Sequence, residues 1–558
     1  MTGLPPTAQL LVADDGARNL EKAQAVLFML GGYDGSGNYG DIAQFLAALA
    51  LVRSADERLV AVPVIEREHM PKHAQLLGGQ PGLDGAVLAQ FDPGLEVLPT
   101  GLRPLALPSG TAAAGAYLYG GGFLNPSWGD RKLAHLHAMQ RAVGAAGLEL
   151  SVLLGSGLQV DSDWVSRLAP ADAGLLAGFK SLGVRDLGSM AAVAELLRDG
   201  RRAPEAPLTG DDAVGFLAQY VAGPPPFSTE WPPTAGFRIN VHLNDHEWVT
   251  DDPEGLMVFV ATFLEELAQV ARQPIVVQPI MGYEDPRISE RPGIDRFAAL
   301  CRQKGLGIEE AILLRPASMN ACVPVLRQAA LTVSCSYHIA LTSLLLGVPT
   351  AIVVGNPYYR QKAAGLQSDF SLPDTLLLEP RSSPGAAARR AFDDLSDAEG
   401  RAALDAAQHA GALRVVARRQ ETEEHLAQLL SEAVEAGIGP GIETLQRRLQ
   451  RGSVAAAELM HELAILRVER QALVRVAEDQ RARLAQLEQA LIEQRTTVAR
   501  HSAPAPPETQ LAALERHIRV VEGELEERTR ALGLVLSSLS WKLTRPLRTL
   551  KSVLRRRT

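Results

Sequence analysis

The sequence is poor in cysteine and in long apolar runs. Its 558 residues include three cysteines, Cys301, Cys322 and Cys335. Their spacing matches no zinc motif and an odd number makes a poor disulfide framework, so we expect a reducing compartment. No segment offers about 18 consecutive apolar residues, which argues against a transmembrane helix. The N-terminus lacks the basic start and apolar run of a signal peptide, which predicts a cytoplasmic protein.

An excess of basic charge is also missing. The formal net charge is -9, and this argues against a nucleic-acid partner, because phosphate backbones reward basic surfaces. The exception is the segment 540–558, which has basic residues and leucines but no acid. Such a tail suits anionic lipid headgroups at the inner face of the membrane, or an acidic partner. A solvated helical extension would have the same composition.

Apolar runs of strand length alternate with helical patterns in two series. This alternation predicts parallel sheets covered by helices on both faces. A proline-rich stretch separates the series, so we expect an α/β fold with two Rossmann-like lobes facing a cleft. Ligands on such sheets bind beyond the carboxyl ends of the strands. The predicted strands are 23–30, 58–65, 116–122, 149–157, 237–243, 273–280, 309–314, 331–336 and 350–355.

Composition and periodicity divide the chain into nine segments. Apolar heptads near the C-terminus, with Arg470 and Gln480 at two seam positions, predict coiled coils that self-associate or bind a partner of the glycan machinery. The expected segments are 1–22 flexible N-terminus, 23–205 N-terminal lobe, 206–236 Pro-rich linker, 237–385 C-terminal lobe, 386–450 helical connection, 451–497 coiled coil, 498–510 break, 511–539 coiled coil and 540–558 basic amphipathic tail.

A glycine-rich loop follows the first predicted strand and opens a helix at Asn38-Tyr39-Gly40-Asp41. Glycines allow close backbone approach, and helix N-termini attract anions. Asn38 is a candidate for orienting an acceptor hydroxyl. Asp41 is placed to act as a base or, equally well, simply to cap the helix.

This loop resembles the GNxGD signature of polysaccharide pyruvyl transferases. Four more elements follow in that family's order, and the resemblance covers roughly residues 24–370. It implies a GT-B-like pair of lobes. The pattern departs at Ser336, where many members carry an arginine implicated in holding phosphoenolpyruvate. The four elements are Gly120-Gly121-Gly122-Phe123, Gly183-Val184-Arg185-Asp186-Leu187-Gly188-Ser189, Ser334-Cys335-Ser336-Tyr337-His338 and Tyr358-Tyr359-Arg360-Gln361-Lys362.

The resemblance implies transfer of the enolpyruvyl unit of phosphoenolpyruvate to a sugar as a pyruvate ketal. Its donor carries a carboxylate and a phosphate, so the site needs cations such as arginine and lysine. His338 is the candidate general acid or base, and Asp41 is a candidate base for the sugar hydroxyl. We expect no metal and no cofactor. The substrate-binding candidates are Asn38, Gly40, Gly120, Gly121, Gly122, Arg185, Ser336, Arg360 and Lys362.

Two other interpretations of the sequence stay open. One is a glycosyltransferase of the same fold with a nucleotide-sugar donor, and the other is a non-catalytic scaffold for glycan assembly, since fold alone does not decide function. The tail segment Ser540-Trp541-Lys542-Leu543-Thr544-Arg545-Pro546-Leu547-Arg548 resembles the SWRxTxPLR ending of bacterial glycosyltransferases.

Overall fold

The computed structural model describes residues 9–438 apart from internal gaps, and Met1–Thr444 form one compact unit. The predicted coiled coils, the break between them and the basic tail lie outside the described residues. The internal gaps are 14–19, 21–23, 34–37, 57, 67–88, 93–101, 106, 108–110, 112, 146–148, 197–205, 222–236, 245–248 and 284–288.

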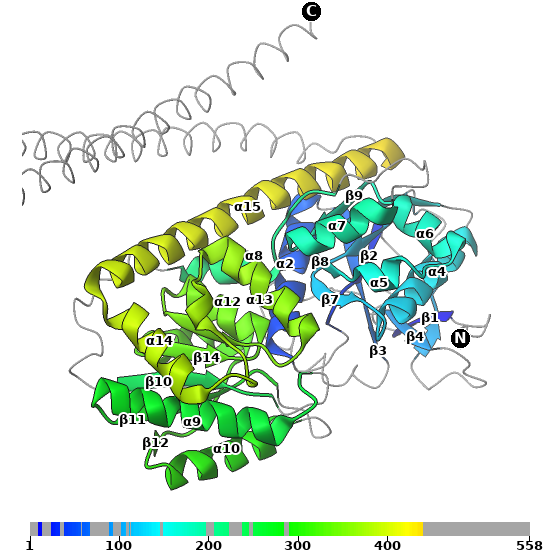
Figure 1. The fold of residues 1–558 in the computed structure, drawn as a ribbon. Coiled ribbons are helices and arrows are strands. Elements are labelled where there is room, and N and C mark those ends of the chain that lie inside the picture. Colours follow the sequence, from blue (N-terminus) through cyan, green and yellow to red (C-terminus); the bar gives the residue numbers. More distant parts are fainter. Residues whose placement is uncertain are drawn as a thin grey trace, which may run out of the picture. The chain divides into compact units, whose positions relative to one another are not determined.

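The N-terminal lobe is built on a mostly parallel sheet (Figure 1). Its strand order is β5-β1-β4-β3-β2-β6-β8-β7, and β9 pairs with β8. β1 pairs antiparallel with β4 and β5, whereas the pairings from β4 to β9 are parallel. The strands are β1 (Gln9–Ala13), β2 (Ala25–Leu30), β3 (Leu59–Glu66), β4 (Ala89–Asp92), β5 (Leu102–Pro104), β6 (Ala113–Leu118), β7 (Gly121–Leu124), β8 (Leu150–Val160) and β9 (Ser181–Val184).

Helices cover both faces of this sheet, as β2 illustrates. Phe28 packs in one apolar cluster with Leu136 of α4, while its neighbour Leu27 packs in another with Phe45 of α2. A strand buried on both faces is a continuous apolar run, as AVLFML is. The helices of this lobe are α2 (Tyr39–Ala55), α4 (Gly129–Ala145), α5 (Ser162–Val165), α6 (Pro170–Ala177), α7 (Leu187–Leu196), α8 (Ala213–Leu217) and η2 (Ala218–Tyr220).

The C-terminal lobe holds a second sheet, whose described pairings are all parallel. Its order is β12-β11-β10-β14-β15-β16, and β13 pairs with β11. The strands are β10 (Phe237–His242), β11 (Ile275–Met281), β12 (Gly307–Ile308), β13 (Ile312–Leu313), β14 (Leu331–Ser334), β15 (Thr350–Val353) and β16 (Leu377–Leu378). The helices are α9 (Pro253–Ala271), α10 (Arg291–Gln303), η3 (Pro316–Ser318), α11 (Met319–Leu326), α12 (Tyr337–Leu345), α13 (Pro357–Phe370), η4 (Asp374–Leu376) and α14 (Pro384–Ser396).

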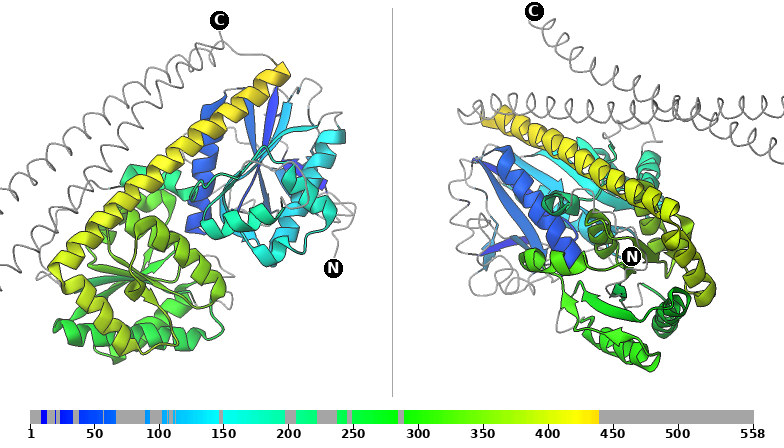
Figure 2. Two further views of the ribbon diagram at one scale, coloured as in Figure 1. Left: turned by 45° about the horizontal axis from the view of Figure 1, so that its top comes forward. Right: turned by 90° about the vertical axis from the view of Figure 1, so that its left-hand side faces the viewer.

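A long helix, α15 (Ala398–Ile438), lies along both lobes (Figures 1 and 2). Its first half contributes Leu404 and Val415 to the core of the C-terminal lobe. Its second half contributes Leu426 and Leu430 to the cluster around α2 in the N-terminal lobe. One continuous helix therefore takes part in both hydrophobic cores.

The predicted fold class is confirmed for the described residues: two α/β lobes each carry a largely parallel sheet. Two features were not predicted. The first is the antiparallel edge made by β1, β4 and β5. The second is that residues 206–221, within the expected linker, hold α8 and η2, and α8 packs against α2. Among the described helices, none is long and apolar enough to cross a membrane.

Candidate active site

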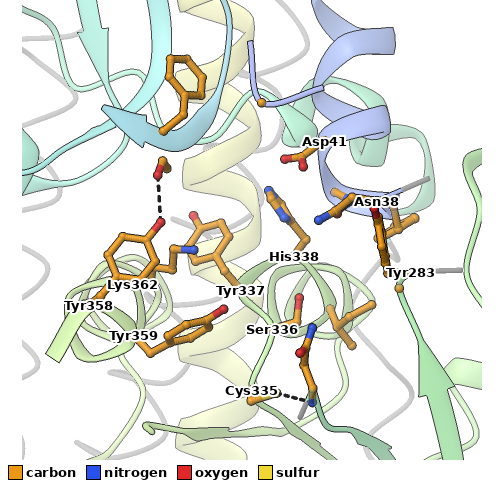
Figure 3. A pocket seen from close by; sticks show the side chains of 18 of the residues that line it. Asn38, Asp41, Tyr283, Cys335, Ser336, Tyr337, His338, Tyr358, Tyr359 and Lys362 are labelled. Carbon is orange, nitrogen blue, oxygen red and sulfur yellow. Dashed lines mark hydrogen bonds between the residues drawn. The ribbon is translucent and has the colours of Figure 1, made fainter. Parts of the chain in front are cut away.

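A cavity of about 400 Å³ lies between the two lobes (Figure 3). The N-terminal lobe lines it with residues after β2 and β9, in β7, and at the starts of α2 and α4. The C-terminal lobe adds residues after β10, β11 and β14 and at the starts of α12 and α13. Carboxyl ends of strands from both sheets thus meet at one opening, where ligands of open α/β sheets bind.

The first turn of α2 supplies Asn38 and Asp41. Asn38 is the N-cap, and its side-chain oxygen accepts the N–H of Gly40 at 3.0 Å. Because Asn38 makes this bond, Asp41 is not the cap that sequence alone allowed, and its carboxylate lines the cavity instead. The next N–H, of Tyr39, donates to the carbonyl of Gly282 at 2.8 Å, which ties the two lobes together beside the cavity.

Because Gly40 has no side chain, the imidazole ring of His338 from the opposite lobe can pack directly against its backbone. A Cβ atom placed on Gly40 would lie 1.9 Å from Nδ1 of His338 and 2.2 Å from its Cγ. No van der Waals contact allows such distances, so any larger residue at position 40 would displace the histidine. Gly40 of the GNxGD-like motif and His338 of the later S-Y-H motif are therefore in direct contact, although they lie far apart in the sequence.

A buried carboxylate lies behind His338. Oδ2 of Asp211 is 3.6 Å from Nε2 of His338, and the Asp211 side chain is 1% exposed. The same carboxylate accepts from the amide of Gln44 at 3.0 Å and from the backbone N–H of Ala213 at 2.9 Å. Burial alone would raise the pKa of Asp211, but His338 and Arg185 outweigh it and hold the pKa below its usual range. Asp211 therefore stays ionised next to the imidazole.

Arg185 reaches the cavity from the end of β9 but its charge is largely engaged. Its Nη1 donates to Asp211 at 3.2 Å, and its Nη2 donates to Gln159. The guanidinium also lies 4.1 Å from the ring centre of Tyr337. Its side chain is 2% exposed. Arg185 thus helps to hold the carboxylate behind His338 and also forms part of the cavity wall.

The triple-glycine turn fits closely around its neighbours. Gly121 has a φ of +122°, a conformation that favours glycine. The carbonyl of Gly122 accepts the hydroxyl of Tyr358 at 2.9 Å, and a Cβ on Gly122 would lie 2.3 Å from that oxygen. Gly122 lines the cavity, whereas Gly120 and Gly121 shape the turn behind it.

The two cations predicted on α13 have different surroundings. Lys362 lines the cavity, with its Nζ 4.2 Å from the ring centre of Tyr358 and 4.9 Å from that of Tyr359. It forms no salt bridge with a described residue. Arg360 does not line the cavity: it is 55% exposed and pairs with Glu379 at 2.8 Å. Lys362 is therefore the cation of this helix that can meet an anionic ligand in the cavity.

A comparison with known protein families identifies the family of this chain. The sequence pattern of polysaccharide pyruvyl transferases matches residues 38–357, from Asn38 at the start of α2 to Pro357 at the start of α13. The chain belongs to the polysaccharide pyruvyl transferase family. The family is one of transferases and implies a polysaccharide acceptor. A search of curated proteins found no significant match to this chain.

Several solved structures resemble the pyruvyl transferase at low sequence identity. They include a putative UDP-N-acetylglucosamine 2-epimerase from Listeria monocytogenes (13% identity, 72% of this chain and 97% of that chain covered, TM-score 0.41). A UDP-GlcNAc 2-epimerase from Neisseria meningitidis bound to UDP-GlcNAc is 10% identical (71% and 100% covered, TM-score 0.39). A UDP-forming trehalose-phosphate synthase from Burkholderia xenovorans is also 10% identical (74% and 99% covered, TM-score 0.40). Values this low say nothing about activity.

The C-terminal wall of the pyruvyl transferase cavity contains a second buried histidine, His242. Its Nε2 lies 3.1 Å from Oε1 of Glu290, and the two side chains are 2% and 3% exposed. Burial alone would lower the pKa of His242, but the Glu290 carboxylate outweighs it and the pKa rises to about 10. Glu290 also accepts the N–H groups of Gly282 and Tyr283. This ion pair holds the loop after β11 against the cavity.

Ser336 is the residue at which the sequence was expected to depart from the family pattern. It is the N-cap of α12, and its side chain makes no capping bond. In Figure 3 it lies beside His338 in the cavity wall. Cationic side chains reach the cavity from elsewhere; besides Arg185 and Lys362, they are Arg131 and Lys132 at the start of α4.

Of the residues predicted for the site, most lie around one cavity. Those that line it are Asn38, Gly40, Asp41, Gly122, Arg185, Ser336, His338 and Lys362. Sequence reasoning missed Asp211, His242, Glu290, Trp128, Arg131 and Lys132. Asp211 had one usable signal: two adjacent acids, Asp211-Asp212, precede an apolar stretch within a segment that was expected to be a solvated linker.

Proposed function

We propose that this pyruvyl transferase moves the pyruvyl group of phosphoenolpyruvate onto a sugar of a cell-surface polysaccharide or its precursor, forming a ketal. The observation that carries the proposal is that one cavity is lined by His338, which has the buried Asp211 behind it, and by Lys362, which pairs with no carboxylate of a described residue. The donor has a phosphate and a carboxylate on a small carbon skeleton. A cavity of about 400 Å³ with cations on its walls suits such an anion.

In this proposal the donor lies against α13 and the start of α12. Lys362 is free of carboxylate partners among the described residues and acts as a point charge on the phosphate or carboxylate. The N-terminus of α12, next to Ser336, favours a negative group as well, because the first N–H groups of a helix have no partner within the helix. In this proposal these contacts bind the donor anion in place of the arginine that the family resemblance led us to expect at position 336.

The reaction then requires three proton transfers. The methylene carbon of phosphoenolpyruvate gains a proton, which leaves a cationic centre at C2. A sugar hydroxyl attacks C2 and loses its proton. Phosphate leaves with the electrons of its C–O bond, and a second hydroxyl of the same sugar attacks C2 to close the ketal, its proton going to the departing phosphate. His338 supplies the first proton, and Asp211 behind it stabilises the imidazolium form. Asp41, whose carboxylate lies near the His338 ring (Figure 3), takes a proton from the sugar.

The acceptor lies toward the N-terminal lobe in this proposal. Trp128 lines the cavity and is 41% exposed, which is unusual for so large an apolar side chain. A pyranose ring has an apolar face of C–H groups that can stack on an indole, while its hydroxyls reach polar neighbours. Phe123 extends this aromatic wall inward.

Direct binding of phosphoenolpyruvate tests the proposal, with two variants on one helix. Titration calorimetry on the full chain should give binding that Lys362→Met weakens by about tenfold or more, because one charge-assisted contact is lost. Arg360→Met should change the affinity less than about twofold, since its partner Glu379 lies outside the cavity.

Equal effects of the two variants, or no binding by the native protein, would contradict the donor assignment. Thermal shift with UDP-glucose and UDP-N-acetylglucosamine separates the rival donor class, because a specific ligand stabilises the fold by mass action. Stabilisation by a nucleotide sugar but not by phosphoenolpyruvate would favour a glycosyltransferase.

A further inference from the structure

Two adjacent aspartates before α8 face different partners. Asp211 lies behind His338, as described above. Asp212, 0% exposed, turns away from the cavity. Its Oδ2 accepts the backbone N–H of Gly120 at 2.7 Å, and its Oδ1 accepts the hydroxyl of Ser156 at 2.6 Å. The two carboxylates are therefore fixed by one short backbone segment.

The cation that balances Asp212 comes from α15, far along the chain. Arg419 is 1% exposed, and its Nη1 pairs with Oδ1 of Asp212. Its Nε donates to Glu423, one turn further along α15, at 2.7 Å. A buried charge is costly unless it is paired and hydrogen-bonded. Arg419 of α15 is therefore held in its buried position by Asp212 of the N-terminal lobe.

Asp212 also connects to the cavity through the triple-glycine turn. Gly120, whose N–H it accepts, in turn accepts the N–H of Gly32 through its carbonyl at 3.2 Å. Gly32 and Gly122 both line the cavity. Moving Asp212 would therefore disturb two parts of the wall as well as the backbone of Asp211.

We propose that Arg419 is a positioning residue of the active site: by pairing with Asp212 it fixes the backbone that sets Asp211 behind His338. The catalytic unit then includes α15, which lies beyond residues 38–357 that match the family. The catalytic meaning of this role rests on the function proposed for His338. The arrangement itself is testable without an acceptor.

The test observes the His338 ring directly in the full-length protein. Histidines are labelled at Cε1 with ¹³C, and the His338 signal is assigned by its loss in His338→Gln. Arg419→Met should move this signal by more than its linewidth and weaken phosphoenolpyruvate binding, whereas Arg419→Lys should restore most of both. Arg414→Met is the matched control, because Arg414 on the same helix donates to the carbonyl of Asp369 at 2.8 Å in the other lobe. It should leave the His338 signal in place.

The double variant Asp212→Asn/Arg419→Met covers the case in which Arg419→Met alone does not fold. It removes both charges of the buried pair, and Glu423, which also loses Arg419 as a partner, is 31% exposed and can be solvated. An unchanged His338 signal in this variant, or an equal change in Arg414→Met, would overturn the proposal. Failure of the native protein to bind phosphoenolpyruvate would instead count against the proposed function, and the His338 signal would still decide the role of Arg419.

Discussion

At the scale of single residues, charge in the cavity walls is arranged in buried pairs that fix side chains. His242 and Glu290 form one such pair, and Asp211 with Arg185 forms another. Buried ion pairs contribute little net stability, yet removing one member is costly because the other is left uncompensated. These pairs make the geometry of the walls sensitive to single substitutions and to pH.

The His242 pair predicts a pH-dependent stability. The pKa of His242 in the folded protein is about 10, above the roughly 6.5 of an unfolded histidine. Its contribution is therefore complete below about pH 6.5 and is lost as the pH rises toward 10. His242→Gln should lower the free energy of unfolding in urea by a few kcal/mol at pH 6 and by much less at pH 10.

His137→Gln serves as the comparison for this experiment. His137 pairs with Asp172 at the surface, where the side chains are 33% and 29% exposed. Such a pair is expected to contribute less than about 1 kcal/mol. A difference between native and His242→Gln protein that stays constant from pH 6 to pH 10 would rule out a charged His242.

At the scale of elements, the approach of α2 to α12 depends on Gly40. Gly40→Ala would help the helix itself by about 0.5–1 kcal/mol. The clash with His338 should nevertheless dominate, since a misplacement of about 1 Å can cost roughly 10²-fold in rate. We expect phosphate release from phosphoenolpyruvate to fall about 100-fold while the melting temperature changes little.

Gly144→Ala is the control for this substitution. Gly144 also lies in a helix, α4, and a Cβ there would meet nothing within 4 Å. It should leave the rate unchanged and stabilise the protein slightly. If Gly40→Ala behaved in the same way, His338 would not need its present position.

Elements differ in how far sequence alone could predict them. The central strand β2 is apolar throughout and was predicted, because burial on both faces leaves a clear pattern. The short strands β4, β5 and β16 have no such pattern, and β1 has only five residues in a segment that was expected to be a flexible N-terminus. At the site, GNxGD and S-Y-H were recognisable because a local backbone feature needs those residue types. Asp211 and His242 were not, since their partners lie in distant segments and only the fold brings them together.

At the scale of the whole molecule, α15 couples the cores of both lobes, and this gives a prediction about stability. Leu426 is 1% exposed and packs in the cluster around α2. Leu426→Ala should lower the free energy of unfolding by about 2–5 kcal/mol, because a cavity forms in a packed core. Leu413→Ala, on the same helix but 53% exposed, should change it by less than about 0.5 kcal/mol. Urea unfolding followed by circular dichroism measures both, and equal effects would contradict the docking of α15.

The 41 residues of α15 extend over about 60 Å at 1.5 Å per residue. The helix contains no proline, the residue that most often kinks a helix, and the backbone of Gly411, between the two docked halves, is closely approached by the Asp369 carbonyl. Moving the lobes apart would require detaching one half of α15 from its hydrophobic core. We therefore expect the spacing of the lobes, and with it the width of the cavity between them, to vary little.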